Sequence, residues 1–232
     1  MEVPLLAALV VGLSGALIVL WTRVHRAAQA EYIRTYMFPA GLLDRLRRQH
    51  PQLSVKDCQL VARGLRQFFL VYLKGGGRFV SMPSQVVDDL WHEFILYTRH
   101  YEAFCRNSFG RFFHHTPAAA LSADRQQNSG LRRVWWYACL DENINPRTPT
   151  RLPLLFALDA KLKIPNGFRY APDCTRLRPG GSGATHCGGD FSSDSFDGTT
   201  DGFGDAGAGD GGSGGDGSGC GGGCGGGCGG GD

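Results

Sequence analysis

The sequence predicts a mainly α-helical protein in three parts: an N-terminal transmembrane helix over residues 1–22, a helical globular domain over residues 23–178 and a disordered Gly/Cys-rich tail over residues 179–232. Residues 3–22 carry no charged side chain, which is typical of a membrane span. Apolar residues in the middle of the chain recur at helical spacing. Glycine is concentrated in the tail, because 25 of the 35 glycines follow residue 179.

The N-terminal segment is long enough to cross a membrane once. A helix of its 20 uncharged residues measures about 30 Å, which matches the hydrocarbon thickness of a bilayer. A cleaved signal peptide is the alternative, but such a peptide begins with basic residues, whereas only Met1 and Glu2 precede this apolar run. The run ends beside Trp21, and tryptophan is enriched at membrane interfaces. We therefore expect a single-pass membrane anchor.

Basic residues predict the orientation of this anchor. Arg23, Arg26 and Arg34 follow the apolar run, and no basic residue precedes it. Under the positive-inside rule the bulk of the chain then faces the cytoplasm. In that compartment the eight cysteines are expected to be reduced thiols or metal ligands, not disulfides.

The middle of the chain is long enough for one domain with its own hydrophobic core. Ser54 is predicted to cap a long helix that stops at Gly75, and Ser84 marks another helix start. An extended piece is expected over residues 78–82 and irregular structure over residues 164–179. The membrane helix is expected to continue over residues 29–37 until Pro39, and further helices are predicted over residues 42–48, 131–140 and 152–163.

The densest chemistry lies in residues 84–115, which hold four of the seven histidines and one cysteine. Asp88 precedes His92 by four residues, the helical spacing at which a carboxylate can orient a metal-binding histidine. A plain hydrogen bond between the two side chains without a metal is the alternative. On one helical wheel a buried stripe is formed by Val87, Trp91, Phe94, Tyr101 and Cys105.

A metal site in this segment requires a break in the helix. In a continuous helix His92 and Cys105 would stand about 19 Å apart, far beyond the reach of one metal ion. The hydroxyl of Thr98 suits an N-cap, and a break there would fold two shorter helices into a corner. Cys105 can also be a simple core cysteine. Since the loop that follows adds two histidines, we predict Zn or another transition metal bound by His92, Cys105, His114 and His115, with Asp88 orienting His92.

The same residues follow a spaced pattern: an Asp, a Trp-His pair, a Tyr nine residues after the His, a Cys four after the Tyr and a Gly five after the Cys. The positions are Asp88, Trp91, His92, Tyr101, Cys105 and Gly110. In this pattern the chain resembles the glycine-rich-domain proteins of plants and their bacterial relatives over residues 35–120. The chain departs at Phe94 and Phe104, where that family frequently has a His and an Asp. The family has no established reaction, so the resemblance implies an architecture and a set of marked residues only.

The tail has a separate character from the domain. It carries eight Asp and no Lys or Arg, a charge of −8, whereas residues 1–179 carry +11. Its small apolar content predicts disorder. Three thiols separated by glycines can converge on one soft ion, namely those of Cys220, Cys224 and Cys228, although a merely solvating extension is the alternative. A second, weaker site is predicted from Cys139, Cys174, His186 and Cys187.

Three hypotheses for function follow. The first is a membrane-anchored cytoplasmic protein of unknown activity that binds a transition metal and carries a thiol-bearing tail. The second is a non-enzymatic scaffold in which Trp91, His92, Tyr101 and Cys105 are core residues and the Gly-rich tail contacts a protein partner. The third is an enzyme that uses His92 or Cys105 as acid, base or nucleophile, with no catalytic residue assigned. No nucleic-acid partner is expected, because the arginines are dispersed and those beside the membrane suit anionic lipid.

Overall fold

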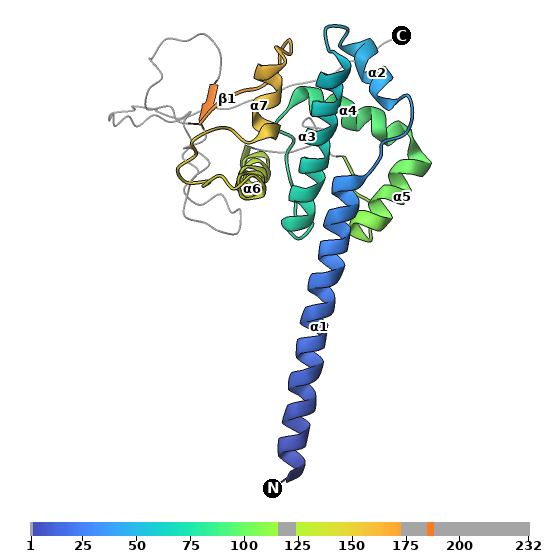
Figure 1. Ribbon diagram of the computed structural model, residues 1–232. Helices are drawn as coiled ribbons and strands as arrows, with labels where there is room; N and C mark the ends of the chain where they lie inside the picture. The colour runs from blue at the N-terminus through green and yellow to red at the C-terminus, as the bar shows by residue number, and fades with distance from the viewer. Residues whose placement is uncertain (1, 116–123, 173–184, 188–232) are drawn as a thin grey trace, which may run out of the picture.

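The computed structural model describes residues 2–115, 124–172 and 185–187, and these confirm the predicted mainly α-helical fold (Figure 1). Helices form almost all of the regular structure in this part of the chain, and two short strands follow them. The elements are α1 Glu2–Thr35, α2 Leu42–Gln49, α3 Val55–Lys74, α4 Gln85–Leu96, α5 Thr98–Phe109, α6 Asp124–Asp141, α7 Leu154–Lys161, β1 Arg169–Ala171 and β2 Thr185–Cys187.

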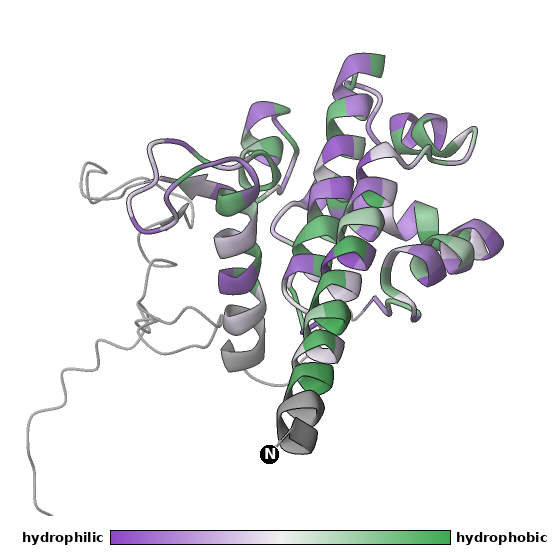
Figure 2. Cartoon of the chain, turned by 60° about the horizontal axis from the view of Figure 1, so that its bottom comes forward, coloured by the Kyte–Doolittle hydropathy of each residue, from purple (hydrophilic) through white to green (hydrophobic). Residues whose placement is uncertain are grey.

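The first helix is one rod that leaves the globular domain and carries the N-terminus far from it (Figure 1). Among the described residues it is the one helix long and apolar enough to cross a membrane, over Leu9–Thr35, and none of its most apolar stretch is buried in the molecule. Figure 2 shows apolar residues around the part of α1 that projects from the domain. Its last turns belong to the domain, since Ile33 is fully buried and Tyr36 packs on Phe104 at a ring distance of 4.6 Å.

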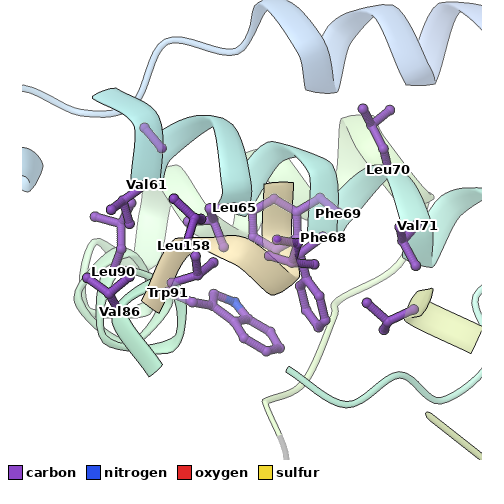
Figure 3. Packing of buried hydrophobic residues seen from close by; sticks show 14 of the residues in the cluster. Val61, Leu65, Phe68, Phe69, Leu70, Val71, Val86, Leu90, Trp91 and Leu158 are labelled. Carbon is purple, nitrogen blue, oxygen red and sulfur yellow. The ribbon is translucent and has the colours of Figure 1, made fainter. Parts of the chain in front are cut away.

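The third helix is the centre of the core, and α1, α2, α4, α6 and α7 all contact it. It begins as predicted at Ser54, whose hydroxyl accepts a hydrogen bond from the Asp57 amide, while the Asp57 carboxylate accepts one from the Ser54 amide. Gly64 permits close packing, because a Cβ atom at this position would collide with Leu158 of α7. Figure 3 shows the apolar cluster along α3, which includes Val61, Leu65, Phe68, Phe69, Leu90, Trp91 and Leu158.

The predicted break in the histidine-rich segment is confirmed. One helix ends at Leu96 and the next begins at Thr98, so that α4 and α5 meet at a corner (Figure 1). The residue at the corner differs from the prediction by one position, because Tyr97 stands at the N-cap with φ −81° and ψ 58° and its side chain forms no capping hydrogen bond.

The start of α4 is fixed by a buried carboxylate from α7. Asp159 is 3% exposed, and its carboxylate accepts hydrogen bonds from the Ser84 hydroxyl at 2.7 Å and from the amides of Gln85 at 2.7 Å and Val86 at 3.3 Å. It also accepts one from the amide of Phe168 at 2.9 Å. The first amides of a helix lack partners within the helix and favour a negative charge. The sequence prediction of a helix start at Ser84 is therefore right: the Ser84 hydroxyl accepts a hydrogen bond from the Val87 amide, and Asp159 adds a second, charged cap.

Polar contacts between side chains hold α4 against α2. The Glu93 carboxylate accepts hydrogen bonds from Arg45 at 3.1 Å and from Gln49 at 2.7 Å. One turn earlier, the imidazole of His50 lies 2.8 Å from the Asp89 carboxylate. These contacts set the rotation of α4 about its own axis, and they leave Asp88 and His92 on a different face.

The later elements differ in length from the predictions. Helix α6 begins at Asp124, seven residues before the predicted start, and α7 lies inside the predicted range 152–163. Residues 164–179 were expected to be irregular, but β1 forms there and pairs in parallel with β2, so that Tyr170 stands opposite His186. Three-residue strands are too short to produce a period-two pattern in the sequence.

Replacing Asp159 with Ala should lower the free energy of unfolding by about 3 kcal/mol, because the Ser84 hydroxyl and three amides lose a charged acceptor in a buried place. Urea unfolding of the full chain in detergent, followed by tryptophan fluorescence, measures this loss. Asp44→Ala is the matched control, since Asp44 is an exposed carboxylate in the first turn of α2 and should change stability by about 0.5 kcal/mol or less. Equal midpoints for the two variants would contradict the role given to Asp159.

Candidate metal centre

Asp88, His92 and His115 form a group in which one ligand atom from each residue lies within 4.8 Å of the others. Asp88 and His92 are neighbours one turn apart on α4, and His115 comes from the segment that follows α5. The two Asp88 oxygens face different imidazoles: one lies 3.5 Å from Nδ1 of His92 and the other 3.1 Å from Nε2 of His115. The two histidine rings are 4.2 Å apart.

The segment after α5 is held in place by a chain of hydrogen bonds through the core. The indole N–H of Trp91 donates to the Tyr101 hydroxyl at 3.1 Å, and that hydroxyl donates to the carbonyl of Phe113 at 2.5 Å. The ring of Phe113 stacks on Tyr72 with centroids 3.8 Å apart and planes 11° apart. Backbone and ring of Phe113 are thus both fixed, and His115 follows two residues later.

Alternation along this extended segment decides which histidine reaches the group. Phe113 is buried and His115 is half-buried, whereas Phe112 and His114 are exposed. His115 packs edge-on against Trp91 at a ring distance of 4.6 Å, while His114 lies beside Phe112 at 4.8 Å. Because side chains two residues apart share a side in extended backbone, the burial of Phe113 places His115 on the inner side.

The group is sheltered on one side and open on the other. The side chain of His115 is 15% exposed, that of Asp88 24% and that of His92 52%. Zinc binds nitrogen and oxygen ligands at about 2.0–2.2 Å, so ligand atoms around one ion stand about 3–3.5 Å apart. The two distances from Asp88 lie in this range, each measured from a different carboxylate oxygen, and one ligand atom from each residue lies within 4.8 Å of the others. A bound ion would then keep at least one position open to solvent.

The structure brings together two of the four predicted ligands, His92 and His115. Asp88, predicted to orient His92, stands at a ligand position, and His114 faces away. Cys105 lies outside the group and is 1% exposed. Its thiol lies against the Phe113 backbone and the Tyr101 hydroxyl, and burial raises its pKa. The buried stripe that carries Trp91 also carries Cys105, which places the thiol in the core.

The other predicted thiol sites have little support among the described residues. Cys139 is fully buried in α6, and burial together with the nearby Glu142 raises its pKa to about 12. The side chains of His186 and Cys187 are not among those described. Cys174 and the predicted tail ligands lie outside the described residues, the latter being Cys220, Cys224 and Cys228.

Two features of the site escape the sequence patterns. Tyr101 is recognisable as a core residue from the helical wheel, but its hydrogen bond to the carbonyl of Phe113 depends on the path of the chain after α5. The alternation of exposed and buried residues from Phe112 onward indicates that His115, and not His114, faces the group. That signal becomes readable only when the segment is known to be extended.

Comparison with known proteins gives a family without an assigned activity. Neither the curated proteins nor the solved structures include a match to this chain. A family model described as UCP032817-like matches residues 28–191, a region that begins in the last part of α1 and contains all three residues of the candidate metal centre. Because the match spans well over half of the chain, the protein belongs to the UCP032817-like family.

Proposed function

We propose that this protein is a membrane-anchored metal-binding protein in which Asp88, His92 and His115 hold Zn²⁺ or another divalent transition metal. One observation carries the proposal: a carboxylate and an imidazole of α4 and a second imidazole from the segment after α5 converge within 4.8 Å around a side that is open to solvent. Coordination would satisfy the donor atoms of all three side chains at once. Ligand pairs of this kind also gain from the half-buried position of Asp88 and His115, since water competes less strongly there.

The donor set narrows the choice of metal. Two nitrogen ligands and one oxygen ligand are of borderline hardness, which suits Zn²⁺, Fe²⁺ and similar ions. Cu⁺ prefers thiolates, and the nearby Cys105 thiol is buried outside the group. Sites with three protein ligands and an open position are typical of catalytic rather than structural metals, because water or substrate can occupy the free position. A bound ion would supply Lewis acidity or an activated water there.

A scaffold without metal is the second candidate function. Asp88 can receive a hydrogen bond from each imidazole, so the group can be satisfied with no ion present. In this case His92 and His115 would contribute to stability alone. Metal content therefore separates the two candidates, and stability by itself does not.

An enzyme remains the third candidate, and the two residues named for it differ in their surroundings. Cys105 is buried with a raised pKa, both of which oppose a role as nucleophile. His92 is half-exposed and stands at the open side of the group. Acid or base catalysis would therefore rest on His92 and on a ligand bound beside it.

The proposal includes the location of the chain. We place the apolar part of α1 across a membrane, in agreement with its length and with side chains that no other part of the described chain covers. Arg23, Arg26 and Arg34 then favour a cytoplasmic domain. We further propose kinship with the glycine-rich-domain proteins, supported by the spacing of Asp88, the Trp91–His92 pair, Tyr101, Cys105 and Gly110. The tail thiols and a protein partner of the Gly-rich tail belong to the same proposal.

Elemental analysis tests the metal centre directly. The full chain purified in detergent should contain about one transition-metal ion per chain in a background where Cys220→Ser, Cys224→Ser and Cys228→Ser remove the tail thiols. His92→Ala and His115→Ala should each weaken binding by at least about tenfold, since each removes a direct ligand. Asp88→Asn should do the same because it removes the negative charge.

Two histidines outside the group, one on α5 and one beside His115, supply the controls for this experiment. His114→Ala and His100→Ala replace exposed residues outside the group and should leave the metal content unchanged. Cys105→Ser should also retain the metal. A purified chain with no stoichiometric metal, or equal loss with His92→Ala and His114→Ala, would refute the centre.

Alkylation tests the catalytic role of Cys105. Because the thiol is buried and its pKa is raised, iodoacetamide at pH 8 should modify Cys105 in the folded chain at least about a hundredfold more slowly than in urea. Mass spectrometry of the peptide that contains Cys105 gives both rates. Modification of the folded protein at the unfolded rate would restore Cys105 as a candidate nucleophile.

Labelling of the tail tests the orientation. With the domain and tail in the cytoplasm, a membrane-impermeant maleimide should label Cys220, Cys224 and Cys228 only after cells that express the full chain are permeabilised. A variant with serine at these three positions corrects for other thiols. Labelling of intact cells at the same level would contradict the cytoplasmic orientation and place the tail outside the cell.

A further inference from the structure

The side of the domain nearest to the projecting part of α1 contains a small basic pocket. In Figure 1 the C-terminal ends of α3 and α5 reach the same level beside α1, so that they form the base of the domain. A pocket of about 250 Å³ opens at this base, and we call it the base pocket. Its lining includes Arg26, Gln29, Tyr72, Gly77, Phe109 and Arg111.

The base pocket lies close to the expected membrane surface. The uncharged stretch of α1 ends at Thr22, and Arg26 follows one helical turn later, about 6 Å further along the axis. The headgroup layer on each side of a bilayer is about 5–8 Å thick. The guanidinium of Arg26 therefore lies at the depth of lipid phosphates, and so does the wall of the pocket formed by α1.

The charge of the base pocket is positive and has no internal counter-ion. Two arginines line it, and no carboxylate is among its lining residues. Within the described part of the chain Arg26 makes no hydrogen bond or ion pair. Arg111 donates to the Tyr72 hydroxyl at 3.0 Å and to the carbonyl of Gly77, which are neutral acceptors. Both positive charges thus remain available to an anion.

The turn after α3 is shaped to receive Arg111. Gly77 has φ +69°, and a Cβ atom at this position would overlap the guanidinium of Arg111. The guanidinium also lies over the ring of Tyr72, 5.7 Å from its centroid. An arginine whose position is already fixed loses little conformational entropy when it binds a phosphate. Arg111 is therefore prepared for binding without a ligand.

A further arginine of α1 lies near the base pocket. Arg23 lies one turn closer to the membrane along α1 and adds to the positive potential.

We propose that the base pocket binds the phosphate of an anionic phospholipid headgroup in the leaflet next to the domain. Arg26 and Arg111 supply the charge-assisted hydrogen bonds, since guanidinium groups match the geometry of phosphate oxygens. The lipid would link α1 to the ends of α3 and α5 at the membrane surface. This inference rests on the membrane anchor of the proposed function and is independent of the metal centre.

Lipid retention tests the inference on the full chain. The protein is reconstituted in nanodiscs of equal amounts of phosphatidylcholine and phosphatidylglycerol, and native mass spectrometry gives the ratio of the two lipids that stay bound after release. Phosphatidylglycerol should be in excess. Arg26→Gln should reduce that excess about fivefold, the effect of removing one cation near a charged membrane.

Arg99→Gln is the matched control. Arg99 is an exposed arginine in the first turn of α5, whereas the base pocket lies at the C-terminal end of that helix. This control should leave the lipid ratio unchanged. Arg111→Gln should reduce the excess of phosphatidylglycerol as Arg26→Gln does. The Arg26 variant is the decisive one, because its removal breaks no hydrogen bond within the domain, whereas Arg111 bonds Tyr72 and Gly77. Equal retention of the two lipids, or equal effects of Arg26→Gln and Arg99→Gln, would overturn the inference.

Two further measurements separate the causes of failure. Inorganic phosphate at about 10 mM, roughly ten times the Kd of a weak anion site with Kd near 1 mM, should not displace phosphatidylglycerol. Complete displacement would assign the pocket to soluble phosphate and overturn the lipid inference. Extraction with alkaline carbonate tests the anchor: release of the chain would refute both the anchor and the lipid site. Retention in the membrane with no lipid preference would refute the lipid site alone.

Discussion

The buried carboxylate of Asp159 is the interaction on which the arrangement around α4 depends. A carboxylate removed from water is strongly unfavourable unless donors surround it. Here the donors are the Ser84 hydroxyl, the first amides of α4 and the amide of Phe168. These groups come from two separate segments, the start of α4 and the residues before β1, and Asp159 of α7 is satisfied only when both meet it. The position of α4 relative to α7 follows from that requirement.

This restraint extends to the metal centre through the register of α4. Asp88 lies one turn after the capped start, and His92 lies one turn further. A shift or rotation of α4 would carry both side chains with it. On a neighbouring face, the ion pair of Arg45 with Glu93 opposes rotation about the helix axis. Two of the three proposed ligands are therefore positioned by contacts that touch neither of them.

The third ligand depends on a second set of contacts. His115 is placed by the ring of Phe113, which stacks on Tyr72, and by the hydroxyl of Tyr101, which holds the Phe113 carbonyl. These contacts lie in the aromatic core and join α4 through Trp91, whose indole N–H donates to the Tyr101 hydroxyl, and not through its capped start. The centre forms where the two restraints meet, so damage to either one should separate the carboxylate and imidazoles without removing a ligand.

The helices follow from local patterns and could be predicted from the sequence. Ser54 and Ser84 are strong N-caps, and the corner before Thr98 was expected from the residue that stands there. Local patterns could not supply Asp159, because it caps a helix that starts about 75 residues earlier in the chain. The same limit applies to Asp88, whose second imidazole partner comes from the far side of α5.

Cys105 shows how one pattern can favour two interpretations. As part of a spaced set of His and Cys residues it was grouped with His92 as a ligand. As part of the helical stripe with Trp91 and Tyr101 it belongs in the core, and that is where the structure places it. A residue on the buried stripe of a helix and a residue on its polar flank point in different directions. The buried stripe therefore predicts the position of the Cys105 thiol correctly, and the polar flank predicts that of the Asp88 carboxylate.

The uninterrupted course of α1 has a mechanical consequence. The helix passes from its projecting apolar part to the buried Ile33 without a hinge, and its last turns pack on α3 and α5. A stiff rod of this kind transmits torque and tilt along its whole length. In a bilayer whose thickness changes, the tilt of α1 would change with it, and the domain would swing as a rigid lever. The distance of Asp88, His92 and His115 from the membrane surface, and the direction in which their open side faces, would then depend on the thickness of the membrane.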